Sequence, residues 1–74
     1  MIAYKNLNND SGVIEYEIGN GIISVKFRDG KIYDYTNSIT GANNVIQMIK
    51  LAQNGSGLNS FINSYVKKLY ARKR

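Results

Sequence analysis

The feature that most constrains this chain is a change of hydrophobic period near residue 36. Between residues 13 and 36, apolar and polar side chains alternate, which is typical of strands with one buried face. Two dipeptides, Asn20-Gly21 and Asp29-Gly30, interrupt the alternation, and both tolerate the positive φ angles of tight hairpins. The sequence therefore predicts a three-stranded antiparallel meander, to which residues 2–5 could add a short edge strand.

The first predicted hairpin has a register that agrees with its turn. A two-residue loop at positions 20 and 21 places the large apolar residues of both strands on one face. The expected pairs are Ile18 with Ile23, Tyr16 with Val25, and Ile14 with Phe27.

The second turn allows two registers. A two-residue loop would place Tyr33 and Tyr35 beside Lys26 on the solvent face. A three-residue loop, with Gly30 as a left-handed bulge residue, would instead pair Val25 with Tyr33 and bring both tyrosines to the core face. We favour the bulge because it buries two aromatic rings, and the tyrosines are then core residues whose hydroxyl groups reach water.

Beyond Thr36 the apolar spacing becomes helical. It predicts one helix over about 41–53, capped by Ser38 or Thr40, and a second over about 58–71. Both helices should cover one face of the sheet, since a three-stranded sheet needs such cover. The first stripe comprises Val45, Ile46, Met48, Ile49 and Ala52, with Leu51 outside it, and the second comprises Leu58, Phe61, Ile62, Tyr65, Val66 and Leu69.

Missing residue types limit the chemistry of the chain. Its 74 residues include no His and no Cys, which excludes an imidazole base, a thiolate nucleophile, a disulfide and a nitrogen–sulfur zinc site. Glu15 and Glu17 share a strand face and could form an acid–base pair, but solvated strand positions explain them better. We predict one α+β domain over 1–74 that is not an enzyme and has no catalytic residue, metal or cofactor.

Two further absences bear on where the protein is found. No run approaches the roughly 18 apolar residues of a membrane span, and the first residues lack a basic segment followed by an apolar one. We therefore expect neither secretion nor membrane insertion. The lack of cysteine favours the cytoplasm.

Positive charge is concentrated in the second half of the chain. Residues 1–37 contain four basic and five acidic residues, whereas residues 38–74 contain six basic residues and no acidic one. This asymmetry predicts a polyanionic partner, with nucleic acid first and an anionic membrane surface second. A basic terminus is also often a solubilising tail, and residues 71–74 fit that description.

A longer pattern in the meander resembles a known family. The run Ile23-x-Val25-x-Phe27-x-x-Gly30-x-x-Tyr33-x-Tyr35 is similar to the KTSC family, named for a short domain at the C-terminus of some lysyl-tRNA synthetases. The resemblance covers about residues 11–70. The further matching positions are Ser11, Ile39, Met48, Ile49, Ala52, Phe61-Ile62-Asn63, Val66 and Tyr70.

The resemblance implies the fold and, as an expectation, RNA binding. The family occurs as a lone bacterial domain and as an appendage to a tRNA-handling enzyme, and RNA binding has been suggested for it. This chain departs from the family where Ile39-Thr40 replaces the usual Val-Pro, and where a few extra residues separate Gly57 from Phe61.

Two classes of function follow from these observations. The leading hypothesis is weak binding of RNA or single-stranded nucleic acid by a basic C-terminal helix, with a tyrosine that stacks on a base. The alternative is a protein-interaction module that tethers or inhibits a larger partner through an edge strand or the second helix, with Leu51 and Ile32 as exposed apolar candidates. The candidate nucleic-acid-binding residues are Lys67, Lys68, Arg72, Lys73, Arg74, Tyr33 and Tyr35.

Overall fold

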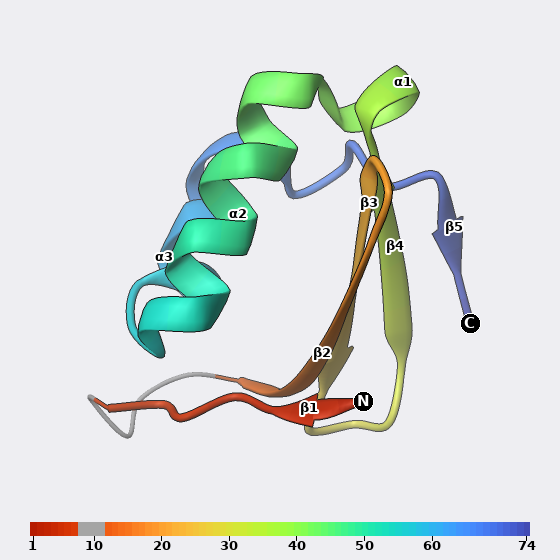
Figure 1. Ribbon diagram of the computed structural model, residues 1–74. Helices are drawn as coiled ribbons and strands as arrows, with labels where there is room; N and C mark the ends of the chain where they lie inside the picture. Colours follow the sequence, from red (N-terminus) through yellow and green to blue (C-terminus); the bar gives the residue numbers. More distant parts are fainter. Residues whose placement is uncertain (8–11) are drawn as a thin grey trace.

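A computed structural model describes residues 1–7 and 12–74, which form a sheet layer and a helical layer (Figure 1). Ser11, one of the positions that match the KTSC pattern, lies outside the described residues. The predicted α+β class and the antiparallel meander are confirmed, and the edge strand before the meander is present. The five strands follow one another in chain order: β1 (Ile2–Ala3), β2 (Val13–Gly19), β3 (Ile22–Phe27), β4 (Ile32–Thr36) and β5 (Arg72–Lys73).

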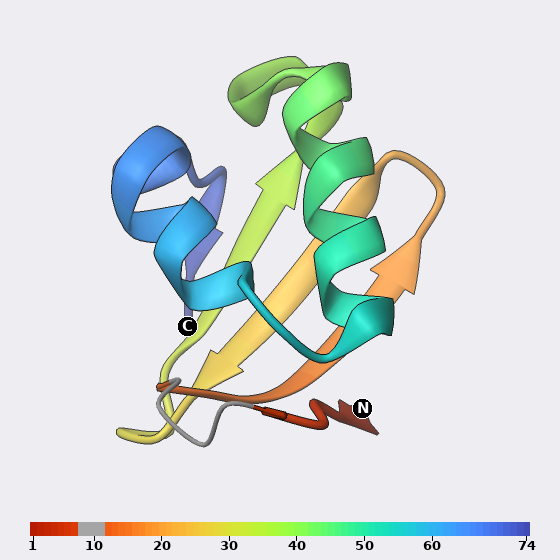
Figure 2. The ribbon, with the colours of Figure 1, turned by 90° about the vertical axis from the view of Figure 1, so that its left-hand side faces the viewer.

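The helices lie across one face of the sheet (Figure 2). They are α1 (Asn37–Thr40), α2 (Ala42–Asn54) and α3 (Leu58–Phe61), and α3 continues into a π-helical turn, η1 (Ile62–Val66). The first predicted helix is confirmed to within one residue at each end. Within the described part of the chain, the helices are too short or too polar to cross a lipid bilayer.

The last residues form a strand, so the predictions of a helix to residue 71 and of a basic tail over 71–74 are wrong. Arg72 and Lys73 pair with Asp34 and Tyr33 of β4. Beyond them, the Arg74 N–H donates to the Ile32 carbonyl at 2.7 Å, and the Ile32 N–H donates back at 3.0 Å. The free edge of β4 offers unpaired backbone groups, and β5 satisfies them.

The first hairpin keeps the predicted register near its turn but not farther out. A β-bulge between Val13 and Glu15 shifts the pairing, so that Val13 rather than Ile14 lies opposite Phe27. Accordingly, Val13 is 1% exposed and Ile14 is 37% exposed. The predicted pair of Ile14 with Phe27 is wrong, because one extra residue in a strand reverses which side chains face the core.

The second hairpin has the predicted bulged register. Gly30 has a φ of 88°, in the left-handed region. Val25 pairs with Tyr33, and Ile23 pairs with Tyr35. Both tyrosines therefore lie on the helix-covered face, where Tyr35 is buried and Tyr33 is partly buried.

The core lies between this face and the helices. In α2 the buried residues are Val45, Met48 and Ala52. Two residues of α2 differ from the predicted stripe: Ile46 is 51% exposed, whereas Leu51 packs against the core. The reason is the chain after α2, which turns back at Gly57 and passes the Leu51 flank of the helix.

The second stripe is shorter than predicted. Leu58, Ile62 and Val66 are buried, but Tyr65 is 68% exposed and Leu69 is 41% exposed. A π-helical turn holds more residues than an α-helical one, which rotates Tyr65 off the stripe. Leu69 is exposed because the chain leaves the helix after Val66.

The predicted cap of the first helix is also wrong. The Thr36 side chain accepts a hydrogen bond from the Ile39 N–H at 3.4 Å and starts α1, and Gly41 then separates α1 from α2. The Thr40 hydroxyl instead donates to the Leu69 carbonyl at 2.5 Å. Thr40 thereby ties the segment before β5 to the helical layer.

Two left-handed glycines allow a matched test of the fold. Gly30 and Gly55 have φ angles of 88° and 80°. A Cβ at Gly55 would lie 2.6 Å from the Cβ of Lys5, whereas a Cβ at Gly30 would meet no described atom within 4 Å. Gly30→Ala should therefore cost about 1 kcal/mol of unfolding free energy, and Gly55→Ala clearly more, because a Cβ cannot swing aside as a side-chain end can. Urea denaturation followed by circular dichroism measures both, and equal losses would contradict the packing around Gly55.

Candidate nucleic-acid interface

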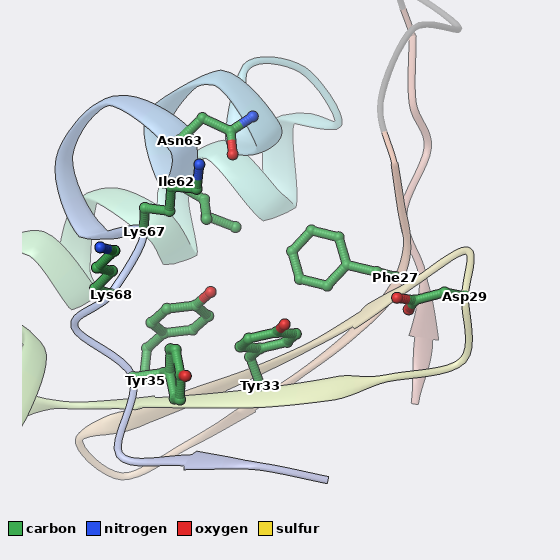
Figure 3. Close-up of a pocket in the computed structure, with 9 residues that line it drawn as sticks. Phe27, Asp29, Tyr33, Tyr35, Ile62, Asn63, Lys67 and Lys68 are labelled. Atoms are coloured by element: carbon green, nitrogen blue, oxygen red, sulfur yellow. The ribbon is translucent and has the colours of Figure 1, made fainter.

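A pocket of about 360 Å³ opens between the sheet and the last helical segment (Figure 3). The β3–β4 hairpin forms one side, and η1 with the residues after it forms the other. The pocket lies between this hairpin and the segment that leads from η1 to β5, the strand that pairs with β4. Its lining residues are Phe27, Asp29, Tyr33, Tyr35, Ile62, Asn63, Lys67, Lys68 and Tyr70.

Aromatic rings form the side of the pocket made by the sheet. The Tyr33 ring lies 5.3 Å from the Phe27 ring and 5.0 Å from the Tyr70 ring, with nearly perpendicular planes of 82° and 88°. The Tyr35 ring lies 6.4 Å from Tyr33 and nearly parallel to it. Edge-to-face and offset pairs of this kind are the favoured aromatic arrangements, so the cluster is a preformed apolar wall.

Tyr35 belongs to this wall and not to the exposed surface. It is 1% exposed. Burial raises the pKa of its hydroxyl well above the ordinary value, and the nearby Tyr33 and Tyr70 raise it further. The phenol is therefore neutral at physiological pH, and we assign it a structural part in the site.

Lys67 and Lys68 follow η1 and lie on the opposite side of the pocket from Asp29 (Figure 3). Both lysines are exposed, because they come just after the last buried residue of the helical segment, Val66. Two ammonium groups at the rim of an aromatic pocket attract an anionic ligand.

A third lysine reaches the aromatic cluster from β5. The Nζ of Lys73 lies 5.5 Å from the centroid of the Tyr33 ring. A side-chain hydrogen bond with Tyr33 is the main cause that raises the pKa of Lys73. Lys73 is therefore charged at neutral pH and stands beside the pocket without lining it.

Arg72 and Arg74 point to the other face of the sheet, since alternate strand residues face opposite sides. The Nε of Arg72 lies 3.0 Å from one carboxylate oxygen of Asp34, and the Nη2 of Arg74 lies 2.9 Å from the other. The Ser24 hydroxyl donates to the Asp34 carboxylate at 2.6 Å. Asp34 thus holds both arginines on the face away from the pocket.

The charge state of Asp34 follows from these partners. Burial by itself would raise the pKa of this carboxyl, but hydrogen bonds from Arg74, Ser24 and Arg72 outweigh it and hold the pKa below its usual value. The sequence contains no acidic residue in the last segment, yet the sheet supplies one to it. The charges of Arg72 and Arg74 are therefore partly neutralised, which the sequence did not indicate.

Of the seven site residues named from the sequence, four line the pocket: Tyr33, Tyr35, Lys67 and Lys68. Sequence reasoning missed the other five lining residues. Tyr70 and Asn63 belong to the segments that resemble the KTSC family and could have been found there, and Phe27 lies on the same strand face as Val25. Ile62 lies in the same matching segment as Asn63, whereas Asp29 has no sequence signal beyond its place in a turn.

No protein-family model, no curated protein and no solved structure matches this chain. The resemblance to the KTSC family therefore rests on the residue pattern alone.

Proposed function

We propose that this protein is a non-enzymatic KTSC-like domain that binds RNA or another single-stranded nucleic acid weakly. The observation that carries the proposal is the meeting of an aromatic cluster and two lysines around one pocket of about 360 Å³. Aromatic surfaces beside basic residues are the usual platform of single-strand and RNA binders, because every base has a face that stacks and every linkage has a phosphate.

The aromatic and basic residues have separate parts in this proposal. Lys67 and Lys68 attract the phosphates, which supplies most of the affinity and makes binding sensitive to salt. Tyr33, which is only partly buried, contacts a base that enters the pocket. A base can enter only when it is unstacked, which favours single strands and loops over a regular duplex.

The remaining basic residues make smaller contributions. Lys73 lies next to Tyr33 and adds positive charge to the same side. Arg72 and Arg74 form ion pairs with Asp34, so we expect them to contribute less to the binding affinity than Lys67 and Lys68. The basic site is thus the segment after η1 rather than the end of a long helix.

The protein-interaction module has less support. Ile32 and Leu51, the apolar residues that the sequence singled out for such a surface, are both partly buried. The larger exposed apolar side chains on the helical layer are instead Ile39, Ile46, Tyr65 and Leu69. The preference for nucleic acid rests instead on the pocket, where aromatic and basic side chains meet.

The proposal predicts a defined salt dependence. For a labelled single-stranded oligonucleotide, log affinity should fall with log salt by about 0.7 for each phosphate contacted. Lys67→Ala with Lys68→Ala should flatten that slope by roughly one to two units and weaken all sequences alike, because phosphate contacts carry no base information. Fluorescence polarisation across a salt series measures both effects.

A matched control separates the site from net charge. Lys5 and Lys50 are exposed and do not line the pocket. Replacing both by alanine also removes two of the net five positive charges, and the slope should stay near that of the parent protein. Tyr33→Ala should weaken binding beyond the phosphate effect. Undetectable binding at low salt would move the assignment to the protein-interaction module, and equal slopes for the two double variants would mean that net charge, rather than the pocket, attracts the oligonucleotide.

A further inference from the structure

We propose that the pocket reads the base it receives, and that it prefers guanine to uracil through the carboxylate of Asp29. This inference rests on the proposed function, since it concerns which nucleotide occupies the same pocket. Its volume of about 360 Å³ is near the low end of small-molecule sites, roughly 300–1,000 Å³, so it suits one nucleotide rather than several.

The charges around the pocket set the direction of a bound nucleotide. Lys67 and Lys68 lie on one side and Asp29 on the other (Figure 3). A phosphate is attracted to the lysine side and repelled from the carboxylate side. The base of that nucleotide therefore extends along the aromatic wall toward Asp29, with its hydrogen-bonding edge foremost.

An ionised carboxylate can only accept hydrogen bonds. The Oδ1 of Asp29 already accepts the Lys31 N–H at 3.0 Å, which holds the side chain in place at the turn. The carboxylate has about four acceptor sites, so it can still accept from a base. The pocket should therefore favour a base whose edge presents neighbouring N–H donors.

The four bases differ in this respect. Guanine presents two adjacent donors, N1–H and the N2 amino group, which match the two oxygens of a carboxylate. Adenine and cytosine each present one amino group beside an acceptor nitrogen. Uracil presents one N–H between two carbonyl oxygens, and both oxygens would be repelled by the carboxylate. The expected order is guanine first, adenine and cytosine next, and uracil last.

A single-position substitution series tests this order. The probes are fluorescein-labelled oligouridylates of one length whose central nucleotide is guanosine, adenosine, cytidine, inosine or uridine, measured at one low salt concentration. The guanosine probe should bind about five- to tenfold more tightly than the uridine probe, the lower end for a bidentate base contact because Asp29 is exposed. Inosine lacks the N2 amino group and should fall between them.

The decisive variant is Asp29→Asn, which keeps the acceptor for the Lys31 N–H and removes the charge. The ratio between the guanosine and uridine probes should fall below about twofold, while the uridine probe binds as well or better because repulsion of phosphate is lost. Glu17→Gln, on the opposite face of the sheet, removes the same charge and should leave the ratio unchanged.

The outcomes distinguish this inference from the proposed function. Salt-dependent binding with equal affinity for all probes would overturn the base preference and leave the nucleic-acid site standing. A guanine preference that survives Asp29→Asn would also overturn the inference, because another group must then read the base. Undetectable binding of every probe would remove both proposals.

Discussion

Leu58→Ala is expected to lower the free energy of unfolding by about 2–5 kcal/mol, one of the largest losses open to a single substitution in this protein. Leu58 is fully buried at the start of α3, and its N–H donates to the Tyr4 hydroxyl at 3.3 Å. A domain of this length has a total stability of roughly 4–11 kcal/mol. The variant should therefore melt at a clearly lower temperature than the parent protein. Thermal denaturation followed by circular dichroism measures this shift.

The control for this prediction is a leucine on the surface. Leu7 is 66% exposed, so Leu7→Ala should change the unfolding free energy by no more than about 0.5 kcal/mol. Similar melting curves for Leu58→Ala and the parent protein would mean that α3 does not pack on the sheet as described. The α3–η1 side of the pocket would then lose its support.

Replacing both Arg72 and Arg74 by alanine should cost about 2–3 kcal/mol at neutral pH. The side chain of Asp34 is 5% exposed, so the variant would leave a buried carboxylate with only the Ser24 hydroxyl as a described side-chain partner. Removing one side of a fully buried ion pair costs roughly 3–5 kcal/mol. We expect a loss of only about 2–3 kcal/mol here because the arginine side chains are 64% and 44% exposed, so that water screens part of the interaction. Urea denaturation at pH 7 measures the loss.

The pH dependence of this loss has a definite sign. In the parent protein, the pKa of Asp34 lies below its usual value of 3.8, so its stabilising contribution is present above that pH and is lost as the pH falls through the native pKa. Without the arginines, burial should raise the pKa above 3.8, and the contribution changes sign. The deficit of the variant should then be largest at neutral pH and shrink as the pH falls through the raised pKa.

Two further variants test the cause. Adding Asp34→Asn to the arginine double variant should recover part of the stability, because the buried charge is gone and Ser24 keeps an acceptor. The Lys5 and Lys50 double variant removes as much charge and should melt like the parent. A deficit that is equal at pH 7 and pH 4.5 would mean that the arginines act by packing alone.

The ion pairs that Asp34 forms with Arg72 and Arg74 also affect the pocket. Because β5 alternates its side chains, fixing Arg72 and Arg74 on one face turns Lys73 toward Tyr33 on the other. The Asp34 carbonyl also accepts the Ala71 N–H at 2.7 Å, directly after Tyr70. Release of β5 should therefore disturb the aromatic cluster without touching the rim lysines.

Much of the fold could be predicted from local signals. The Asn20-Gly21 and Asp29-Gly30 turns, the alternation between them and the bulge at Gly30 are fixed by short-range sterics. The bulge at Val13 could not be predicted in the same way. Val13 and Ile14 are both apolar, so either could face the core until the pairing with β3 sets the register. The start of the helix predicted over 58–71 agrees with that of α3 at Leu58, but its end could not be predicted.

The candidate site divides in the same manner. The sequence by itself determined which residue types were present, and it placed Tyr33, Lys67 and Lys68 among the candidates, since unpaired basic residues and alternating aromatics are visible without a fold. Only the tertiary structure decided which of them meet. Lys73 and the two arginines are neighbours in sequence, but β5 separates them onto opposite faces, and Asp34 of β4 takes up the arginines. Pairing across 38 and 40 positions of chain depends on packing, which no local pattern contains.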